Sequence, residues 1–208
     1  MNDEVELRVA WKSSIGATPD AMMAFDDVVG RHREAHRRYH DVRHVTWVIR
    51  HVRWLAATEP ADDVDAVVAA AFFHDAIYEP IANDNEARSA ALAGRVLGQL
   101  GWRPDRCRTV AALVRATEHH LASADPGVGV LNDADLAVLG SEPAAYQAYV
   151  TGVRAEYAHV DDDGWRRGRA AVLRRLLERQ ALYATSTARR RWESPARANM
   201  TAELAALE

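Results

Sequence analysis

The feature that most restricts the fold of this chain is the spacing of its apolar residues. In almost every segment they recur at the three- and four-residue intervals that form one stripe along a helix. A strand would instead need sustained alternation of apolar and polar residues with β-branched enrichment, and no stretch of the sequence has it. The sequence therefore predicts an all-α protein.

Capping residues, prolines and glycines divide this pattern into separate helices. Thr18 and Pro19 are typical of a helix start, and we expect that helix to run toward Tyr39. A proline and two glycines predict a loop around residues 126–129. The other expected helices contain, approximately, residues 45–55, 63–79, 85–101, 104–120, 132–140, 143–153, 163–184 and 192–207.

Size and composition favour one domain. A chain of 208 residues, 49% of them hydrophobic, can bury one sizeable core. Because no repeat or low-complexity linker divides it, we expect a single domain over residues 1–208, with C-terminal helices, about 163–207, packing on the core. No apolar run is long enough to span a bilayer, and the acidic N-terminus is unlike a signal peptide. These features predict a cytoplasmic protein that does not enter the membrane.

Charge and cysteine content limit the classes of molecule and metal ligand that this chain can be expected to use. A formal net charge of −4 lacks the basic balance of a non-specific nucleic-acid binder. Arginines crowd the last fifty residues, as solvated helix faces or, alternatively, as a basic wall for an anionic substrate. The Trp and Tyr residues of the C-terminal helices would suit a homodimer face. With Cys107 as the only cysteine, any metal must be held by nitrogen and oxygen.

Two histidines and a carboxylate fall on apolar helical faces. His44 precedes Val48 by one helical turn and so lies on the stripe that faces the core. His74 and Asp75 follow Ala71 by three and four residues, which places both at the buried end of a neighbouring helix. A buried carboxylate is costly unless it is paired or bound to a metal. The pattern is compatible with a metal site, while a histidine on such a face, taken singly, is more often a satisfied core residue.

The order of these residues resembles a known signature. A histidine, a His-Asp pair about thirty residues later and an aspartate about sixty residues after that resemble the H…HD…D pattern of the HD superfamily. Further blocks look like those of the predicted metal-dependent HD phosphohydrolases of bacteria, and they lie at residues 39–45, 73–78, 85–90, 133–140, 153–157 and 193–199. The resemblance covers about residues 20–205. It implies an HD-domain helical bundle, a divalent metal ion and hydrolysis of a phosphate ester.

The last aspartate could be Asp133 or Asp135. The triplet Ala134-Asp135-Leu136 is similar to the context of the last metal ligand in cyclic-nucleotide phosphodiesterases of the same superfamily. We therefore expect Asp135 to be the ligand, with Asp133 orienting a histidine or capping the helix. The predicted metal ligands are His44, His74, Asp75 and Asp135, a nitrogen and oxygen set that suits Mn, Fe, Co, Ni, Zn or Mg.

Three residues have predicted catalytic roles. Asp75 would hold or deprotonate the attacking water, while His120 and Arg154 would offset charge on the phosphoryl group. His120 continues the stripe of Leu113 and Thr117 in the expected helix. It is therefore the candidate for phosphate binding or for a second metal, with a structural role as the alternative.

Substrate binding is assigned to four residues. Tyr39 and His40 would lie at the mouth of the site, since their block recurs in the family. Asn85 and Glu86 open a helix near the His-Asp pair, where they could hold a phosphate or sugar. Helix capping is the alternative for Asn85.

Four further polar residues were assigned to surfaces or edges of the site. His32 and His36 are expected on a solvated face because arginines surround them. Arg197 and Asn199 would either close the site from the C-terminal helix or serve its packing.

The function expected from the resemblance is metal-dependent hydrolysis of a small phosphorylated molecule, with nucleotides as one candidate class. Two alternatives remain open. Some HD proteins hold two irons and oxidise a C–H bond with dioxygen, which would make His120 the discriminating residue. A non-catalytic nucleotide sensor with a structural metal is the other alternative.

Overall fold

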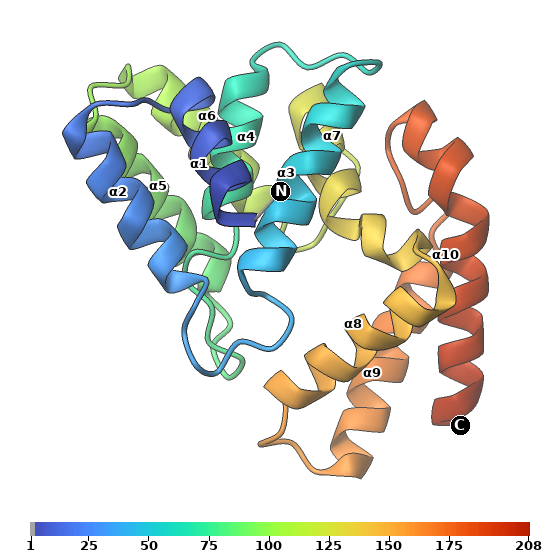
Figure 1. Cartoon of the computed structure of the whole chain (residues 1–208). Coiled ribbons are helices and arrows are strands. Elements are labelled where there is room, and N and C mark those ends of the chain that lie inside the picture. The colour runs from blue at the N-terminus through green and yellow to red at the C-terminus, as the bar shows by residue number, and fades with distance from the viewer. Residues whose placement is uncertain (1–2) are drawn as a thin grey trace.

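The computed structural model describes residues 3–208, and these residues form helices joined by loops (Figure 1). The helices are α1 (Asp3–Ser14), α2 (Pro19–Arg31), α3 (Val42–Ala56), α4 (Val64–Phe73), α5 (Asn85–Gln99), α6 (Pro104–Ala116), α7 (Pro126–Asp135), the 3-10 helix η1 (Leu136–Gly140), α8 (Pro143–Glu156), α9 (Asp162–Leu177) and α10 (Ser186–Leu207). No strand occurs among the described residues, so the predicted all-α fold is confirmed. Within residues 3–208 no helix combines the length and the apolarity that a membrane crossing requires.

The core is built around α4. Every residue of this helix from Ala66 to Phe73 is buried, as expected for a helix that is apolar on all sides. Helices α1, α3, α5, α6 and α7 pack against it. The Trp11 ring of α1 meets Phe72 edge to face, with ring centroids 5.0 Å apart. This enclosure matters for function because the predicted His74-Asp75 pair follows directly at the end of α4.

Local capping explains where the central helices begin. The Asp41 carboxylate accepts hydrogen bonds from the backbone N–H groups of Arg43 and His44, at 2.8 and 3.2 Å, and so caps α3. Asp63 caps α4 by accepting from Ala66 N–H at 3.0 Å. Each cap starts a helix that carries a predicted metal ligand or leads to one.

The helix expected to run toward Tyr39 ends at Arg31 instead. Two side chains of the segment that follows are buried against the α4 end, and this contact overrides local helix propensity. The His32 ring donates to the Phe72 carbonyl at 3.1 Å, and the Arg37 guanidinium donates to the Asp75 carbonyl at 2.8 Å. The prediction of a solvated face was therefore wrong for His32.

The region around Pro126 also differs from the prediction, since it begins α7 rather than a loop. Asp125 accepts from Gly127 N–H at 2.8 Å and caps the helix, with Pro126 in its first turn. A Cβ on Gly127 would lie 3.2 Å from Val67, so this glycine allows α7 to approach α4 closely. Its role is packing, not helix breaking.

The remaining helix ends shift by several residues. The helix α4 ends at Phe73 instead of near Pro80, and α6 ends at Ala116, before the His119-His120 pair. At the C-terminus, α9 ends at Leu177 and α10 begins at Ser186, where Thr185 accepts from Ala188 N–H. The N-terminal helix α1 was not predicted.

The C-terminal helices α8, α9 and α10 lie beside the helices that surround α4 (Figure 1). Helix α10 packs on η1 and α9. The Arg169 guanidinium of α9 forms a buried ion pair with Glu203 of α10 at 2.7 Å. Two aromatic side chains of this C-terminal region, Tyr183 and Trp192, are buried within the chain.

Gly140 is the tightest point between η1 and α10, which gives a prediction. A Cβ there would lie 2.5 Å from the Trp192 Cβ and 2.9 Å from the Trp192 backbone, so one of the two helices must move. We expect Gly140→Ala to lower the free energy of unfolding by about 1–3 kcal/mol in urea titrations.

Gly98 in α5 is the matched control. Nothing lies within 4 Å of a Cβ built there, so Gly98→Ala should raise the free energy of unfolding by about 0.5–1 kcal/mol. Equal effects of the two substitutions would contradict the assigned contact.

Candidate metal centre

Three helix ends bring the four predicted metal ligands together. His44 lies in the first turn of α3, and His74 caps the C-terminal end of α4, directly before Asp75. Asp135 is the last residue of α7. Both histidines are buried, and the two aspartate side chains are 14% exposed. The site is therefore enclosed but retains access to solvent.

The ligand atoms lie at similar distances from one another. The His44 and His74 Nε2 atoms are 3.2 Å apart. An Asp75 oxygen lies 3.4 Å from the His44 Nε2 and 3.1 Å from the His74 Nε2. An Asp135 oxygen lies 3.2 and 3.6 Å from the same two nitrogens. His44, His74 and Asp75 form a group that could hold a metal ion, and Asp135 faces it.

The donor set fits a divalent ion. Metal bonds of about 2.0–2.2 Å to imidazole nitrogen and carboxylate oxygen place neighbouring ligand atoms about 3.0–3.5 Å apart, close to the separations seen here. The His74 Nδ1 lies 2.9 Å from the Ala71 carbonyl and donates to it, which leaves the Nε2 lone pair of the neutral ring facing the cluster. His44 Nδ1 is buried without a hydrogen-bond partner, so only Nε2 of that ring interacts with polar groups.

The electrostatics of the cluster favour positive charge. Burial alone would lower the pKa values of His44 and His74, but the carboxylates of Asp75 and Asp135 raise both, that of His74 well above its usual value. Burial would likewise raise the pKa values of the two aspartates, yet the facing histidines hold both well below their usual range. The site therefore stabilises cations, whether protons or a metal ion.

His120 lies at the edge of this cluster. Its Nε2 is 2.7 Å from the second oxygen of Asp135, opposite the oxygen that faces the other histidines. The residue lies beyond the end of α6 and adopts a positive φ of 47°, an uncommon conformation for a non-glycine residue. The Arg179 guanidinium, between α9 and α10, donates to the carbonyls of His119 and His120 at 2.8 Å each. The C-terminal segment therefore holds the His120 turn in place.

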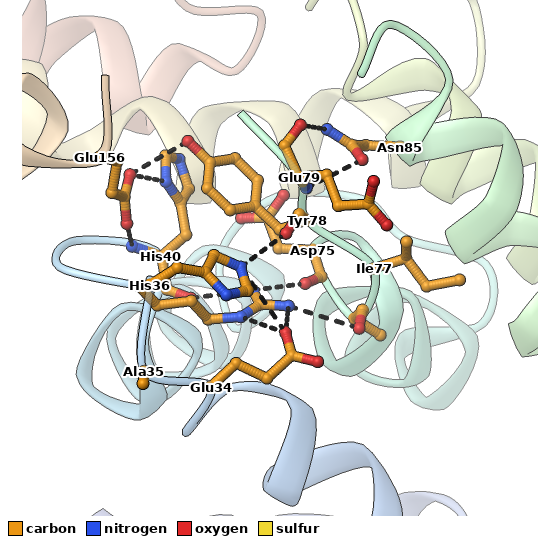
Figure 2. A network of polar contacts seen from close by, with 12 residues as sticks. Glu34, Ala35, His36, His40, Asp75, Ile77, Tyr78, Glu79, Asn85 and Glu156 are labelled. Carbon is orange, nitrogen blue, oxygen red and sulfur yellow. Dashed lines mark hydrogen bonds and ion pairs between the residues drawn. The ribbon is translucent and has the colours of Figure 1, made fainter. Parts of the chain in front are cut away.

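A buried carboxylate, Glu156 of α8, holds the loop that carries Tyr39 and His40 (Figure 2). One Glu156 oxygen accepts from the backbone N–H groups of Arg38, Tyr39 and His40 at 2.8, 2.8 and 3.0 Å. The other oxygen lies 2.7 Å from His40 Nδ1 and accepts from the Tyr78 hydroxyl at 3.0 Å. Burial opposes the charge, but these contacts lower the pKa of Glu156 to about 2, so the carboxylate is ionised.

The Tyr39 ring connects this loop to the cluster. Its centroid is 4.8 Å from that of His44 and 4.9 Å from that of His40. Burial raises the pKa of Tyr39 well above its usual value, and Tyr149 and the carboxylates of Asp135 and Asp75 raise it further. The Tyr39 hydroxyl therefore stays protonated. The structure thus brings the predicted substrate-binding residues Tyr39 and His40 next to His44, one of the predicted metal ligands.

The other predicted substrate residues divide between two roles. The Asn85 side chain accepts from Glu79 N–H at 3.0 Å and donates to the Glu79 carbonyl at 2.9 Å, which fixes the loop before α5. The capping alternative for Asn85 was wrong, because Asp84 is the N-cap of α5 and Asn85 lies in its first turn. Glu86 is half-buried, and burial together with the nearby Asp75 and Glu118 carboxylates raises its pKa. Of this pair, only Glu86 has a pKa that the Asp75 carboxylate of the cluster helps to raise.

Arg154 does not take part in the cluster, contrary to its predicted catalytic role. Its guanidinium donates to the carbonyls of Tyr157 and Val160 and to Asp162 at 2.8, 3.1 and 2.8 Å. It also lies over the Trp165 ring. These contacts secure the turn between α8 and α9, so charge on a substrate would have to be offset by other groups.

Asp133 differs from its prediction, which was to orient a histidine or to cap its own helix. It accepts from the backbone N–H groups of Ala184 and Thr185 at 2.7 Å each and thereby ties α7 to the start of α10.

Of the two histidines expected on a solvated face, His36 is exposed, although its ring donates to the Tyr78 carbonyl at 2.8 Å. Burial of His32 lowers its pKa to about 3, so that ring is neutral.

Arg197 and Asn199 serve packing, the second of their two predicted alternatives. Arg197 donates to Glu193 and to the Leu177 and Arg179 carbonyls. Asn199 donates to the carbonyls of Leu139 and Ser141, at 2.9 Å each.

Two cavities are lined in part by histidines that belong to the cluster or to its edge. One, of about 250 Å³, is lined by His44 together with residues of α3, η1 and α8. The other, of about 700 Å³, is lined by His120 together with residues of α7 and the segment that leads into α10. Each cavity therefore shares one histidine with the charged cluster.

Comparison with models of protein families, with curated proteins and with solved structures found no match to this chain.

Two residues that support the site, Glu156 and Arg179, were not predicted from the sequence. Glu156 lies in one of the blocks that resemble the HD family, which was the only signal for it, and Arg179 had none beyond the C-terminal cluster of arginines.

The Glu156 contacts predict acid sensitivity. Because the folded-state pKa of about 2 lies below the usual 4.5, the ionised carboxylate stabilises the fold above pH 4.5, and this contribution is lost as the pH falls toward 2. We expect Glu156→Gln to lower the free energy of unfolding at pH 6 by up to about 3 kcal/mol. The difference from wild type should shrink in denaturant titrations at lower pH.

The exposed substitution Glu178→Gln serves as the control and should leave the pH dependence unchanged. A Glu156→Gln protein as stable as wild type at pH 6 would show that the five contacts make no net contribution to the free energy of unfolding.

Proposed function

We propose that this protein is a metal-dependent phosphohydrolase that cleaves a phosphate ester of a small molecule. The observation that carries the proposal is the meeting of two imidazole nitrogens and two carboxylates, 3.1–3.6 Å apart, at the ends of three helices. The order of these residues resembles the HD superfamily, and we propose that the chain is one of its members.

His44, His74, Asp75 and Asp135 would hold the ion. When bound, a divalent ion lowers the pKa of a bound water and neutralises charge on a phosphoryl oxygen. The water oxygen forms a bond to phosphorus, and the ester P–O bond breaks. Asp75 would orient the water and accept its proton, and this proton would then pass to the departing alkoxide oxygen to give the alcohol.

His120 is the second group that would act on substrate. It is partly exposed and already fixed by Asp135 on one side and by Arg179 through its backbone on the other. In this position its ring can donate to a phosphoryl oxygen and offset developing charge. We assign this role to His120 in place of Arg154, which is engaged elsewhere.

The diiron oxygenase is the second candidate, because Asp135 presents its two oxygens to different histidines. One oxygen faces His44 and His74, and the other faces His120, so Asp135 and His120 are the residues that would hold a second iron. Two irons per chain and oxygen consumption with a polyol or phosphonate would favour this reaction over hydrolysis.

Asp75→Asn tests the proposed function. We expect the purified wild-type protein, supplied with Mn²⁺, to hydrolyse a generic phosphomonoester such as 4-nitrophenyl phosphate. Loss of one charged ligand should lower metal affinity and turnover by at least about 100-fold. Metal content is measured by elemental analysis and metal affinity by calorimetry.

His120→Asn tests the role of the second group, and His119→Asn is its matched control, because the two residues are neighbours with different surroundings. The His119 side chain is exposed and lies 3.4 Å from Glu118, so its replacement should leave turnover unchanged, whereas that of His120 should lower it. Metal binding without turnover of any phosphate ester would favour the nucleotide sensor. Turnover that survives chelation of the metal would contradict the mechanism.

A further inference from the structure

The cavity beside His44 has walls suited to a flat ring. Its volume of about 250 Å³ is below the range of about 300–1,000 Å³ typical of sites for complete drug-sized ligands, so it can take one group of a larger molecule. Aromatic and small apolar side chains form much of its lining, including Tyr39, Trp47, Val138, Ala148 and Tyr149.

Two of the aromatic walls are held in place before any ligand binds. The backbone of Tyr39 is fixed by Glu156, and its ring lies 4.8 Å from that of Tyr149, centroid to centroid. The Tyr149 hydroxyl accepts from Arg169 at 3.0 Å, and the Arg169 guanidinium also lies against the Tyr149 ring. A ring that enters the cavity would therefore meet rigid surfaces, which reduces the entropy lost on binding.

His44 links this cavity to the proposed phosphate site. It lines the cavity, and its Nε2 points at the charged cluster. One molecule can thus place a phosphate at the cluster and an attached ring in the cavity. Charged side chains also line the cavity: Arg43 is paired with Asp41 at 3.1 Å, and the exposed Arg38 brings positive charge near an anionic ester.

We propose that the cavity between α3 and α8 binds a flat aromatic group of the substrate, carried on the alcohol side of its phosphate ester. This inference rests on the proposed function, because it assumes that the phosphate lies at the cluster. Stacking on tyrosine and tryptophan supplies the affinity, and the cavity volume limits the group to one or two rings. A nucleobase and a phenyl ring share this chemistry.

Phenylphosphonate and methylphosphonate test the inference by calorimetry in the presence of Mn²⁺. They carry the same charged group, differ in the ring and contain no ester to hydrolyse. We expect wild type to bind phenylphosphonate about ten-fold more tightly than methylphosphonate. Equal affinity, or no binding of either compound, would overturn the inference.

Ala148→Leu fills the cavity from α8 and should remove the preference for the ring while leaving the affinity for methylphosphonate unchanged. Ala148 is exposed and leucine is a good helix former, so the variant should fold, which its thermal unfolding checks. Ala144→Leu is the matched control, since Ala144 is exposed on the same helix but does not line the cavity. A preference that persists in Ala148→Leu would place the ring elsewhere, including the cavity beside His120, and would overturn the inference.

The two proposals fail separately. A ring preference that Ala148→Leu removes, in a protein without turnover, would support the cavity and contradict hydrolysis. Equal turnover of methyl and phenyl phosphate, with equal binding of the two phosphonates, would support hydrolysis and overturn the cavity assignment.

Discussion

The carboxylates of Asp75 and Asp135 lie against the imidazoles of His44 and His74 at the buried end of α4. Each carboxylate alone would be costly there, because burial removes it from water. Two protonated imidazoles, or one divalent ion with neutral imidazoles, bring the same charge of +2 and balance the two carboxylates. The ends of α3, α4 and α7 therefore depend on one charge balance, which proton or metal can satisfy.

The part of this arrangement that follows from helical periodicity could be predicted from the sequence. His44 shares a stripe with Val48, and His74 and Asp75 lie one turn beyond Ala71, so burial of these faces brings the side chains inward. The all-α fold followed from the same periodicity. Asp135 depended on resemblance, since periodicity alone could not separate it from Asp133.

What the sequence could not predict depends on contacts between distant segments. Residues 32–41 have helical spacing, yet His32 and Arg37 bond to carbonyls at the end of α4, and these bonds replace the helix. Glu156 likewise makes five hydrogen bonds with four residues that lie 78 to 118 positions away in the chain. A carboxylate in an amphipathic helix gives no sign of such partners.

The proposed metal ligands and the residues that hold the loops around them come from different helices. The proposed metal ligands come from α3, α4 and α7, whereas α8 and the segment between α9 and α10 hold the surrounding loops through Glu156 and Arg179. Residues of α8 also line one cavity, and the segment before α10 lines the other. Changes in the C-terminal helices can therefore alter what enters the site without disturbing the charge balance on which the ligands depend.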